Sequence, residues 1–437
     1  MRLRQRCVAA LGAELHGRGT TVSTTDRARL AISPRGALRL KSAAGSYLEH
    51  PLAPYYLLIG CTSLLLGIGL MEVLSASSVS SFKEFGNSYH WFLRQIGWVA
   101  LGIPTALIAA RMPQKLLRGL AWPGIVISIV LIGLTRTSLG VTVNGNTNWV
   151  AFGPVQIQPA ELAKFALILW CASVYAAKEK LLRDPKHVFI PVLPVFALAT
   201  SLVVFLGKDL GTGLVLIAIL LGMLWVAGAP LKWFGAAFIG LSVIALLLAT
   251  TNKERMSRLT SFANPFDHFH GSGWQSAHGL LGIASGGLFG KGIGASQQKW
   301  GNLPAPHTDF IFAVLGEELG LAGTLLVLAL FAGIAWAGIK IAVTSSEPFV
   351  RYFAAGITVW LTVQMVINIG MVLALLPVIG LPLPFVSYGG SSLVPELVSI
   401  GLLISFARRE PRAAAVLRQL ARARARERAV RRGGAPS

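Results

Sequence analysis

Long apolar runs constrain what this chain can fold into more than any other feature of its sequence. About ten of them approach the ~20 residues that a helix needs to cross the hydrocarbon core of a bilayer. Charged residues make up 13% of the chain and the mean hydropathy is +0.64, which is typical of polytopic membrane proteins and excludes a soluble domain. We therefore predict an all-α polytopic membrane protein with spans at Tyr55 to Ser75, Trp91 to Ala110, Leu116 to Leu134, Ala160 to Ala177, Val188 to Leu206, Leu210 to Ala229, Leu231 to Thr250, Leu319 to Ala342, Tyr352 to Leu376 and Ser391 to Phe406.

The distribution of positive charge predicts which side of the membrane each part occupies. The formal net charge of +21 comes mainly from residues 1–54 and 408–437, and alternate connections between the runs are also rich in Lys and Arg. Because cytoplasmic segments carry an excess of these residues, both tails are predicted inside and the long connection 251–309 outside. The membrane domain is then 55–407. Anionic lipid of the inner leaflet, and not nucleic acid, is the expected partner of the tails.

Neither tail predicts a folded domain, and the cysteines predict no chemistry. Residues 1–54 combine Ser, Thr, Gly and Arg without an apolar segment of signal-peptide form, so we expect a disordered cytoplasmic tail. The Arg/Ala segment 412–432 fits a basic helix on the membrane surface and a solvated tail equally well. Cys7, Cys61 and Cys171 lack metal-ligand spacing, so we expect no disulfide. P-loop, HExxH and GxSxG motifs are absent, which excludes familiar chemistries of soluble enzymes.

The connection between the seventh and eighth runs is a large outer loop, residues 251–309. It is far longer than the usual ~4 to 6 residues, and such loops tend to be functional. Its first part is basic and aromatic, and its second part, 282–294, is rich in glycine, which serves either a ligand that approaches the backbone or the close packing of half-buried helices. Its candidate ligand-binding side chains are Arg255, Arg258, Gln298 and Lys299. The two arginines alternatively anchor the loop at the membrane interface.

Asp309 is the strongest single candidate for chemistry. It stands at the mouth of an apolar helix, where desolvation disfavours the ionised form and lone acids are usually functional. The alternative is an N-cap before Phe310. We expect His307 to be a structural hydrogen-bonding residue and not a base, and it is also a candidate substrate-binding residue of the same site. Glu317 and Glu318 are expected at the start of the helix, where acids complement the dipole.

Two polar pairs lie inside predicted spans. Glu161 and Lys164 are three residues apart on one helical face, so they either pair with each other or contact the substrate near the outer end of the fourth span. Gln364 and Asn368 share a face of the ninth span and either join helices or line the cavity. Both pairs are therefore candidates with a structural alternative.

Separated motifs in the order found here resemble the SEDS family, named for shape, elongation, division and sporulation. The resemblance covers nearly all of Tyr55 to Ala407, and the Asn-Gly-Asn-Thr-Asn-Trp run at 144–149 is most similar to the division branch, FtsW, of actinobacterial type. The motifs are Asn144-Gly145 with Trp149, Gln156 to Glu161, Asp209 to Thr212, Arg255 to Gly320 and Leu383 to Ser392.

The resemblance implies a peptidoglycan glycosyltransferase of about ten spans that polymerises lipid II at the outer face of the bacterial cytoplasmic membrane, at the division septum. It implies Asp309, in the His-Thr-Asp-Phe motif, as the essential acid, and Ser387 on the substrate side. Implied partners are a cognate class B penicillin-binding protein and other division proteins of the membrane, and the implied cofactor is a divalent cation, Mg or Mn. One carboxylate without a His/Asp cluster supports that metal only weakly.

The sequence also departs from the family pattern. Lys208 replaces the usual Pro before Asp209, Thr147-Asn148 replaces a basic pair, and Ala160 replaces a Ser. Glu396, inside the last span, is not explained by the pattern. These departures affect the predicted secondary contacts with the ligand. Asp309 remains the candidate for the essential acid.

The chemistry itself is consistent with these residues. Displacing a polyprenyl diphosphate from an anomeric carbon by a sugar hydroxyl needs a base near the hydroxyl, a role for Asp309 that is worth ~10²- to 10⁴-fold. It also needs positive charge at the departing diphosphate, for which Arg255, Arg258 and Lys299 are candidates. One direct displacement inverts the anomeric centre.

Three alternatives remain open at the level of sequence. The chain also fits an elongation polymerase of the RodA branch. The Pro- and Gly-interrupted segment from Pro377 to Gly390 is typical of transporters and lipid flippases, although we find no internal repeat. A scaffold without catalytic activity is the third alternative, and it predicts that Asp309 is dispensable.

Overall fold

Apolar helices make up most of the protein in the computed structural model, which describes residues 48–143, 146–153, 155–237, 239–240, 261–262 and 264–433. Residues Pro51–Ser437 form one unit, and Met1–His50 form another. The elements in chain order are α3 (Ala53–Phe85), α4 (His90–Arg111), α5 (Gln114–Gly119), α6 (Ala121–Leu134), β1 (Gly140–Val143), β2 (Asn146–Phe152), β3 (Val155–Ile157), α7 (Pro159–Ala177), η2 (Glu179–Leu181), α8 (Pro185–Phe189), α9 (Leu193–Ser201), η3 (Leu202–Leu206), α10 (Leu210–Val226), α13 (Trp274–Gly286), η4 (Gln298–Trp300), α14 (Ile311–Thr344), α15 (Pro348–Val372), η5 (Gly390–Ser392), α16 (Leu393–Arg409) and α17 (Pro411–Gly433).

The helices confirm the predicted membrane class. Within the described residues, 7 helical segments are long and apolar enough to cross a bilayer, and α6 and α10 are shorter apolar helices. These segments correspond to all of the predicted runs except Leu231 to Thr250, most of which lies outside the described residues. The predicted tail 1–54 also lies almost entirely outside them.

Local sequence signals explain where several helices begin and end. Pro54, Pro159 and Pro348 stand in the first turns of α3, α7 and α15, where a missing N–H costs no hydrogen bond. The C-terminal residue after α3 is Gly86 with φ 68°, a left-handed cap that glycine adopts without strain. The spans are therefore bounded by sequence signals as well as by hydropathy.

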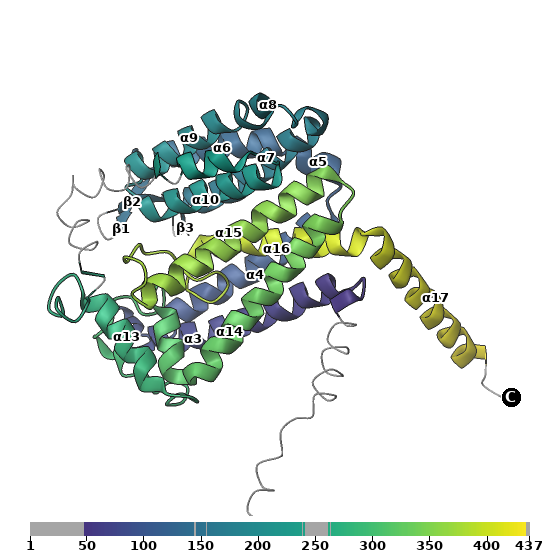
Figure 1. Ribbon diagram of the computed structural model, residues 1–437. Helices are drawn as coiled ribbons and strands as arrows, with labels where there is room; N and C mark the ends of the chain where they lie inside the picture. Colours follow the sequence, from purple (N-terminus) through teal and green to yellow (C-terminus); the bar gives the residue numbers. More distant parts are fainter. Residues whose placement is uncertain are drawn as a thin grey trace, which may run out of the picture. The chain divides into compact units, whose positions relative to one another are not determined.

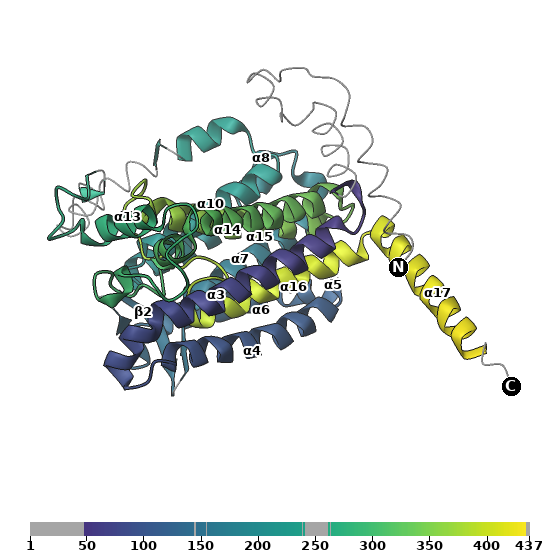
Figure 2. The same cartoon turned by 90° about the horizontal axis from the view of Figure 1, so that it is seen from below.

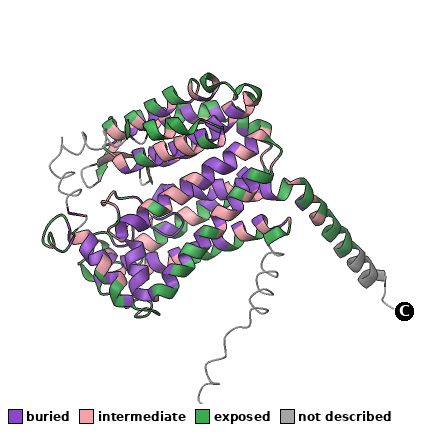
Figure 3. Ribbon diagram, viewed as in Figure 1, coloured by how far each residue is buried: buried purple, intermediate pink, exposed green. Residues whose placement is uncertain are grey.

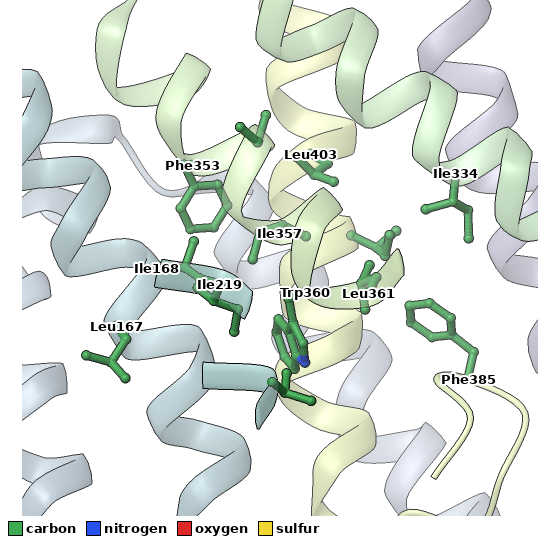
Figure 4. Close-up of a cluster of buried hydrophobic side chains, with 14 of the residues drawn as sticks. Leu167, Ile168, Ile219, Ile334, Phe353, Ile357, Trp360, Leu361, Phe385 and Leu403 are labelled. Atoms are coloured by element: carbon green, nitrogen blue, oxygen red, sulfur yellow. The ribbon is translucent and has the colours of Figure 1, made fainter. Parts of the chain in front are cut away.

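The spans pack side by side as a helical bundle (Figures 1 and 2). Helix α14 packs against α3 and α15, α16 packs against α4, and α15 packs against α7 and α10. Small residues allow close approach, because a Cβ added at Gly401 of α16 would lie 2.7 Å from the Ala106 carbonyl oxygen of α4. The buried faces of the central helices meet in one apolar core, in which Trp360 of α15 is fully buried (Figures 3 and 4).

A small β-sheet interrupts the predicted all-α pattern. Strands β1, β2 and β3 form an antiparallel sheet in that order, with Gly140 opposite Val150 and Val150 opposite Ile157. The sequence analysis did not predict these strands, because they are short and belong to a connection between two spans. The sheet, α13 and the chain after α15 gather at one end of the bundle, which we call the sheet end (Figure 1).

The predicted outer loop contains regular structure. Residues 274–286 form α13, which packs on α14, and η4 follows before α14 begins. The second part of the long connection 251–309 is therefore partly helical. Residues 251–260 and 263 lie outside the described residues.

Candidate functional site

Asp309 lies at the sheet end, just before α14 begins. Its carboxylate accepts a hydrogen bond of 3.0 Å from Thr308 Oγ1, and its backbone carbonyl accepts one of 2.8 Å from Asn368 Nδ2 of α15. The residue is half-buried, and a Cβ built at Gly380 would lie 3.8 Å from its Oδ2. The N-cap position of α14 falls on the following residue and has no side-chain cap. The N-cap alternative is therefore wrong, and the carboxylate lies against the segment that follows α15.

His307 belongs to an aromatic cluster at the same end. Its ring stacks on Trp91 of α4 with centroids 5.4 Å apart, and it is tilted against Tyr388 at 5.7 Å. The Tyr388 N–H donates a hydrogen bond of 2.9 Å to the His307 carbonyl. Burial of the imidazole lowers the pKa of His307 to about 4, so the ring is neutral at pH 7. This placement favours the structural alternative for His307.

Arg94, which the sequence analysis missed, brings a cation to this cluster. It is an exposed residue of α4, and its guanidinium carbon lies 5.6 Å from the centre of the Trp91 ring. Burial raises the pKa of the Tyr388 hydroxyl, and the charge and hydrogen bond of Arg94 oppose that rise. The signal in the sequence was a charge close to the end of an apolar run, where such residues are usually functional.

Two amide side chains of α15 hold the irregular segment that contains residues 377–390. Asn368 Nδ2 donates 2.7 Å to the Leu381 carbonyl as well as 2.8 Å to the carbonyl of Asp309. Gln364 Nε2 donates 3.1 Å to the Pro382 carbonyl. Non-helical backbone inside a membrane protein needs partners of this kind. Both amides are fully buried, so their structural alternative is favoured over direct contact with a substrate.

Ser387 closes a turn within that segment. Its hydroxyl accepts the Leu383 N–H at 2.8 Å, and its carbonyl accepts a hydrogen bond of 3.2 Å from Gln95 Nε2 of α4. The side chain is buried. The structure therefore gives Ser387 a role in shaping the chain beside Asp309.

Glu161 and Lys164 form a buried ion pair on α7. Lys164 Nζ lies 2.7 Å from Glu161 Oε2, and it donates a hydrogen bond of 2.7 Å to Gln364 Oε1. The ammonium also lies 5.3 Å from the centre of the Trp360 ring. Side-chain exposures of 0% for the lysine and 2% for the glutamate leave no surface for a ligand. The pairing alternative is therefore favoured for both.

Lys299 and Gln298 face inward, although both were predicted to bind substrate. The Lys299 ammonium donates hydrogen bonds to Gly294 O at 2.7 Å, Ser75 Oγ at 3.0 Å and Glu318 Oε1 at 3.1 Å. Gln298 Oε1 lies 2.8 Å from Nδ1 of His278, and only 9% of Gln298 is exposed. The predicted ligand role of these two residues is replaced by a structural one, because distant partners occupy their polar atoms.

Glu317 and Glu318 fix the glycine-rich stretch to α14. Glu317 pairs with Lys291 at 2.8 Å and accepts 2.7 Å from Ser296 Oγ, and Glu318 accepts 2.8 Å from the Gly294 N–H. Both carboxylates lie well beyond the first turn of α14, which begins at Ile311. The explanation by the helix dipole is therefore wrong, and both acids anchor the loop.

The glycines of this stretch allow two backbones to touch. A Cβ at Gly286 would lie 2.0 Å from the Gly316 carbonyl oxygen, and one at Gly290 would lie 2.1 Å from that of Glu318. Such separations are impossible for a real Cβ atom. Close packing therefore explains these two glycines without a ligand.

A second carboxylate at the sheet end, Asp209, is structural. It caps α10 by accepting 2.9 Å from the Thr212 N–H and 2.9 Å from its hydroxyl. Asn148 Nδ2 and Gln158 Nε2 also donate to its Oδ2, at 3.0 and 3.3 Å. Asn148, one of the residues that depart from the family pattern, thus joins β2 to the start of α10.

Two further predictions concern Arg255 and Arg258 and a bound metal ion. Arg255 and Arg258 lie outside the described residues. The described residues contain no group of three or more His, Cys, Asp or Glu that fits a metal ion. Asp309 by itself does not form a metal site, because a divalent cation needs several oxygen ligands.

Comparisons with known proteins identify relatives of this chain. It matches the FtsW, RodA and SpoVE family, described as "Cell cycle protein", over residues 55–411. It is 38% identical over 384 residues to the probable peptidoglycan glycosyltransferase FtsW of Mycobacterium tuberculosis, covering 88% of this chain and 73% of that protein. It is 37% identical over 361 residues to stage V sporulation protein E of Bacillus subtilis, covering 82% of this chain and 97% of that protein.

Solved structures share the fold. One chain, from a structure described as "Structural coordination of polymerization and crosslinking by a peptidoglycan synthase complex", superposes with a TM-score of 0.64 at 27% identity, covering 81% of this chain and 97% of that chain. The rod shape determining protein RodA of Thermus thermophilus superposes with a TM-score of 0.58 at 27% identity, covering 81% of this chain and 96% of that chain.

Proposed function

Because the chain belongs to the FtsW, RodA and SpoVE family of cell cycle proteins, we propose that Asp309 is the catalytic base of a multi-pass peptidoglycan glycosyltransferase. The activity follows from the family membership and from the names of the relatives. One observation supports the site: Asp309 is half-buried at the sheet end, where Asn368 of α15 binds its backbone carbonyl and the segment after α15 lies beside its carboxylate. A base must be held in this way to meet a hydroxyl in one geometry.

The substrate we infer is lipid II, and the reaction is a single displacement. The oxygen of the acceptor sugar hydroxyl attacks the anomeric carbon of the donor, and Asp309 takes the hydroxyl proton. The bond from that carbon to the diphosphate breaks, and the polyprenyl diphosphate leaves with the electron pair. Attack opposite the leaving group inverts the anomeric centre.

Positive charge is needed where the diphosphate departs. Arg94 is an exposed cation of the cluster that holds His307, and we assign it to this role in place of Lys299. Arg255 and Arg258 remain predicted contacts of the same diphosphate. A divalent cation remains a predicted cofactor, and no step is derived through it, because the described residues offer no dedicated site.

Location and partners are proposed from the charge pattern and from a structural neighbour. The charge pattern supports a sheet end that faces outward, two cytoplasmic termini and anionic lipid at the tails. The similarity to a chain of a peptidoglycan synthase complex supports a partner that crosslinks glycan, which we propose to be the cognate class B penicillin-binding protein, together with other membrane proteins of the division septum.

The test is polymerisation of purified lipid II by the protein with its partner. We expect Asp309→Asn to lower glycan chain formation by about 10²-fold or more while the protein remains folded, because the base is lost. Asp267→Asn is the matched control, since Asp267 is an exposed acid of the same outer region. Near-normal polymerisation by Asp309→Asn would reject the catalytic assignment and favour a scaffold.

The same assay separates the remaining alternatives. A lipid flippase would move lipid II between leaflets without lengthening glycan, so an inactive wild-type protein that still transfers lipid across vesicles would favour that alternative. An elongation polymerase would be active in the assay but would fail to support division in cells that lack their own septal enzyme.

A further inference from the structure

Glu396 is a buried carboxylate for which the proposed reaction has no use. It lies in the first turn of α16 and is 2% exposed. Its Oε2 accepts the Phe385 N–H at 3.0 Å. A carboxylate inside a membrane span is energetically costly and is usually functional, so the contact with Phe385 is the candidate for its function.

Phe385 adopts a backbone conformation that needs support. Its φ of 63° is left-handed, which is strained for a residue with a Cβ. Its ring is buried in the core near Leu361 (Figure 4), and a Cβ added at Gly69 of α3 would lie 2.5 Å from its carbonyl oxygen. The ring, the carbonyl and the N–H of Phe385 are thus all fixed, and Glu396 fixes the N–H.

The turn around Phe385 leads directly to the proposed base. Its flanks are Leu381, which shares the Asn368 amide with the carbonyl of Asp309, and Tyr388, whose N–H binds the His307 carbonyl. The chain just before Asp309 is therefore bonded to one end of this turn, and Asn368 links the other end to the carbonyl of Asp309. A shift of the turn would disturb both contacts.

We propose that Glu396 is a positioning residue for glycan polymerisation, because its carboxylate fixes the Phe385 turn and thereby the placement of Asp309. The inference rests on the proposed function of Asp309 as the base. This role requires an atom that accepts the hydrogen bond from the Phe385 N–H at the right distance, and it does not require a negative charge.

The charges around Glu396 support that distinction. Glu396 interacts electrostatically with Glu161 and Lys164, and the Lys164 ammonium is ion-paired with Glu161 and hydrogen-bonded to Gln364. The cluster therefore contains two carboxylates and one ammonium. The negative charge of a second carboxylate therefore contributes little stability to this cluster. A neutral side chain of the same length that accepts the hydrogen bond should serve equally well.

Two substitutions separate reach from charge. Glu396→Gln keeps an acceptor oxygen at the same distance and removes the charge, whereas Glu396→Asp keeps the charge and withdraws the oxygen by one methylene. In lipid II polymerisation we expect kcat of the Gln variant within about threefold of wild type, and kcat of the Asp variant lower by about 10- to 100-fold with KM changed less than about threefold. Values are taken per monodisperse folded protein.

Ser399→Ala is the matched control. Ser399 is equally buried on α16, but its hydroxyl bonds only to the Pro395 carbonyl of its own helix. We expect wild-type kcat from it. Equal losses in the Gln and Asp variants, or wild-type kcat in both, would overturn the positioning role.

The same measurements distinguish a failure of the role proposed for Glu396 from a failure of the proposed function. A wild-type protein that does not polymerise lipid II would reject the proposed function itself. An active wild type that loses activity in Asp309→Asn but not in Glu396→Asp would retain the base and reject only the role of Glu396.

Discussion

At the scale of residues, the buried acids are distinguished by their partners. Glu161 faces Lys164, Glu317 faces Lys291 and Glu318 faces Lys299, each at a distance of an ion pair. Buried pairs of this kind satisfy charges that folding has already removed from water. These ion pairs favour a structural role for Glu161, Glu317 and Glu318.

The altered assignment of Lys299 gives a prediction. Removing one partner of a buried pair leaves the other charge uncompensated, so we expect Lys299→Ala to destabilise the protein by about 3 to 5 kcal/mol. The KM for lipid II of the protein that still folds should stay near the wild-type value, since the ammonium faces Glu318. Thermal unfolding in detergent and initial rates measure the two effects.

A second substitution checks the cause. Adding Glu318→Gln to Lys299→Ala removes the uncompensated charge, so the double variant should regain part of the lost stability. Arg255→Ala and Arg258→Ala, by contrast, should weaken lipid substrate binding without loss of stability. A raised KM in Lys299→Ala at unchanged stability would restore its predicted contact with the diphosphate.

At the scale of elements, α14 is two helices joined at Gly320. This glycine has φ 67° and ψ −164°, so the part that carries Glu317 and Glu318 is set off from the longer apolar part. The chain at 287–288 bonds to the backbone of Leu321 and Ala322 just past this point. The kink thus lets the outer region dock on a membrane span through backbone contacts.

Close packing of α13 on α14 predicts the effect of one methyl group. Gly286→Ala places a Cβ 2.0 Å from the Gly316 carbonyl oxygen, so we expect a loss of about 1 to 3 kcal/mol from overpacking. The control is Gly97→Ala on α4, where nothing lies within 4 Å and Ala favours the helix by up to ~1 kcal/mol. Melting temperatures of the two variants should shift in opposite directions. Equal melting temperatures would show that the α13 contact is loose.

At the scale of the whole molecule, the mechanism requires the sheet end to face outward. Asp309, Arg94 and the segment after α15 meet at that end. A lipid-linked donor and a growing glycan meet only outside the cytoplasmic membrane. Membrane sidedness is therefore the property on which every other proposal depends.

Single cysteine reporters test this sidedness. Ser272→Cys, before α13, and Ala435→Cys, near the C-terminus, are built separately in a chain without Cys7, Cys61 and Cys171. Because the positive-inside rule places the tail in the cytoplasm, a membrane-impermeant thiol reagent on cells stripped of their wall should label the first and spare the second. The reverse labelling pattern would invert the topology and exclude an external polymerase site.

The sequence by itself determined the membrane class and the positions of most spans, and it singled out Asp309 as the candidate for chemistry. Spans are local, because about 20 successive apolar residues suffice to define one wherever the rest of the chain lies. The small sheet and helix α13 escaped prediction, since short elements in a connection leave no long periodic pattern. Their form depends on what they pack against.

Only the tertiary structure decided which charged residues are buried in ion pairs. Lys299 meets Ser75 across 224 positions and Gln364 meets Lys164 across 200, and no local pattern announces either contact. A buried charge is neutralised by whichever partner the fold brings near, so its role is a property of the packing and not of the neighbouring sequence. For the same reason Arg94 and Glu396 acquire their proposed roles only where α4 and α16 meet the chain beside Asp309.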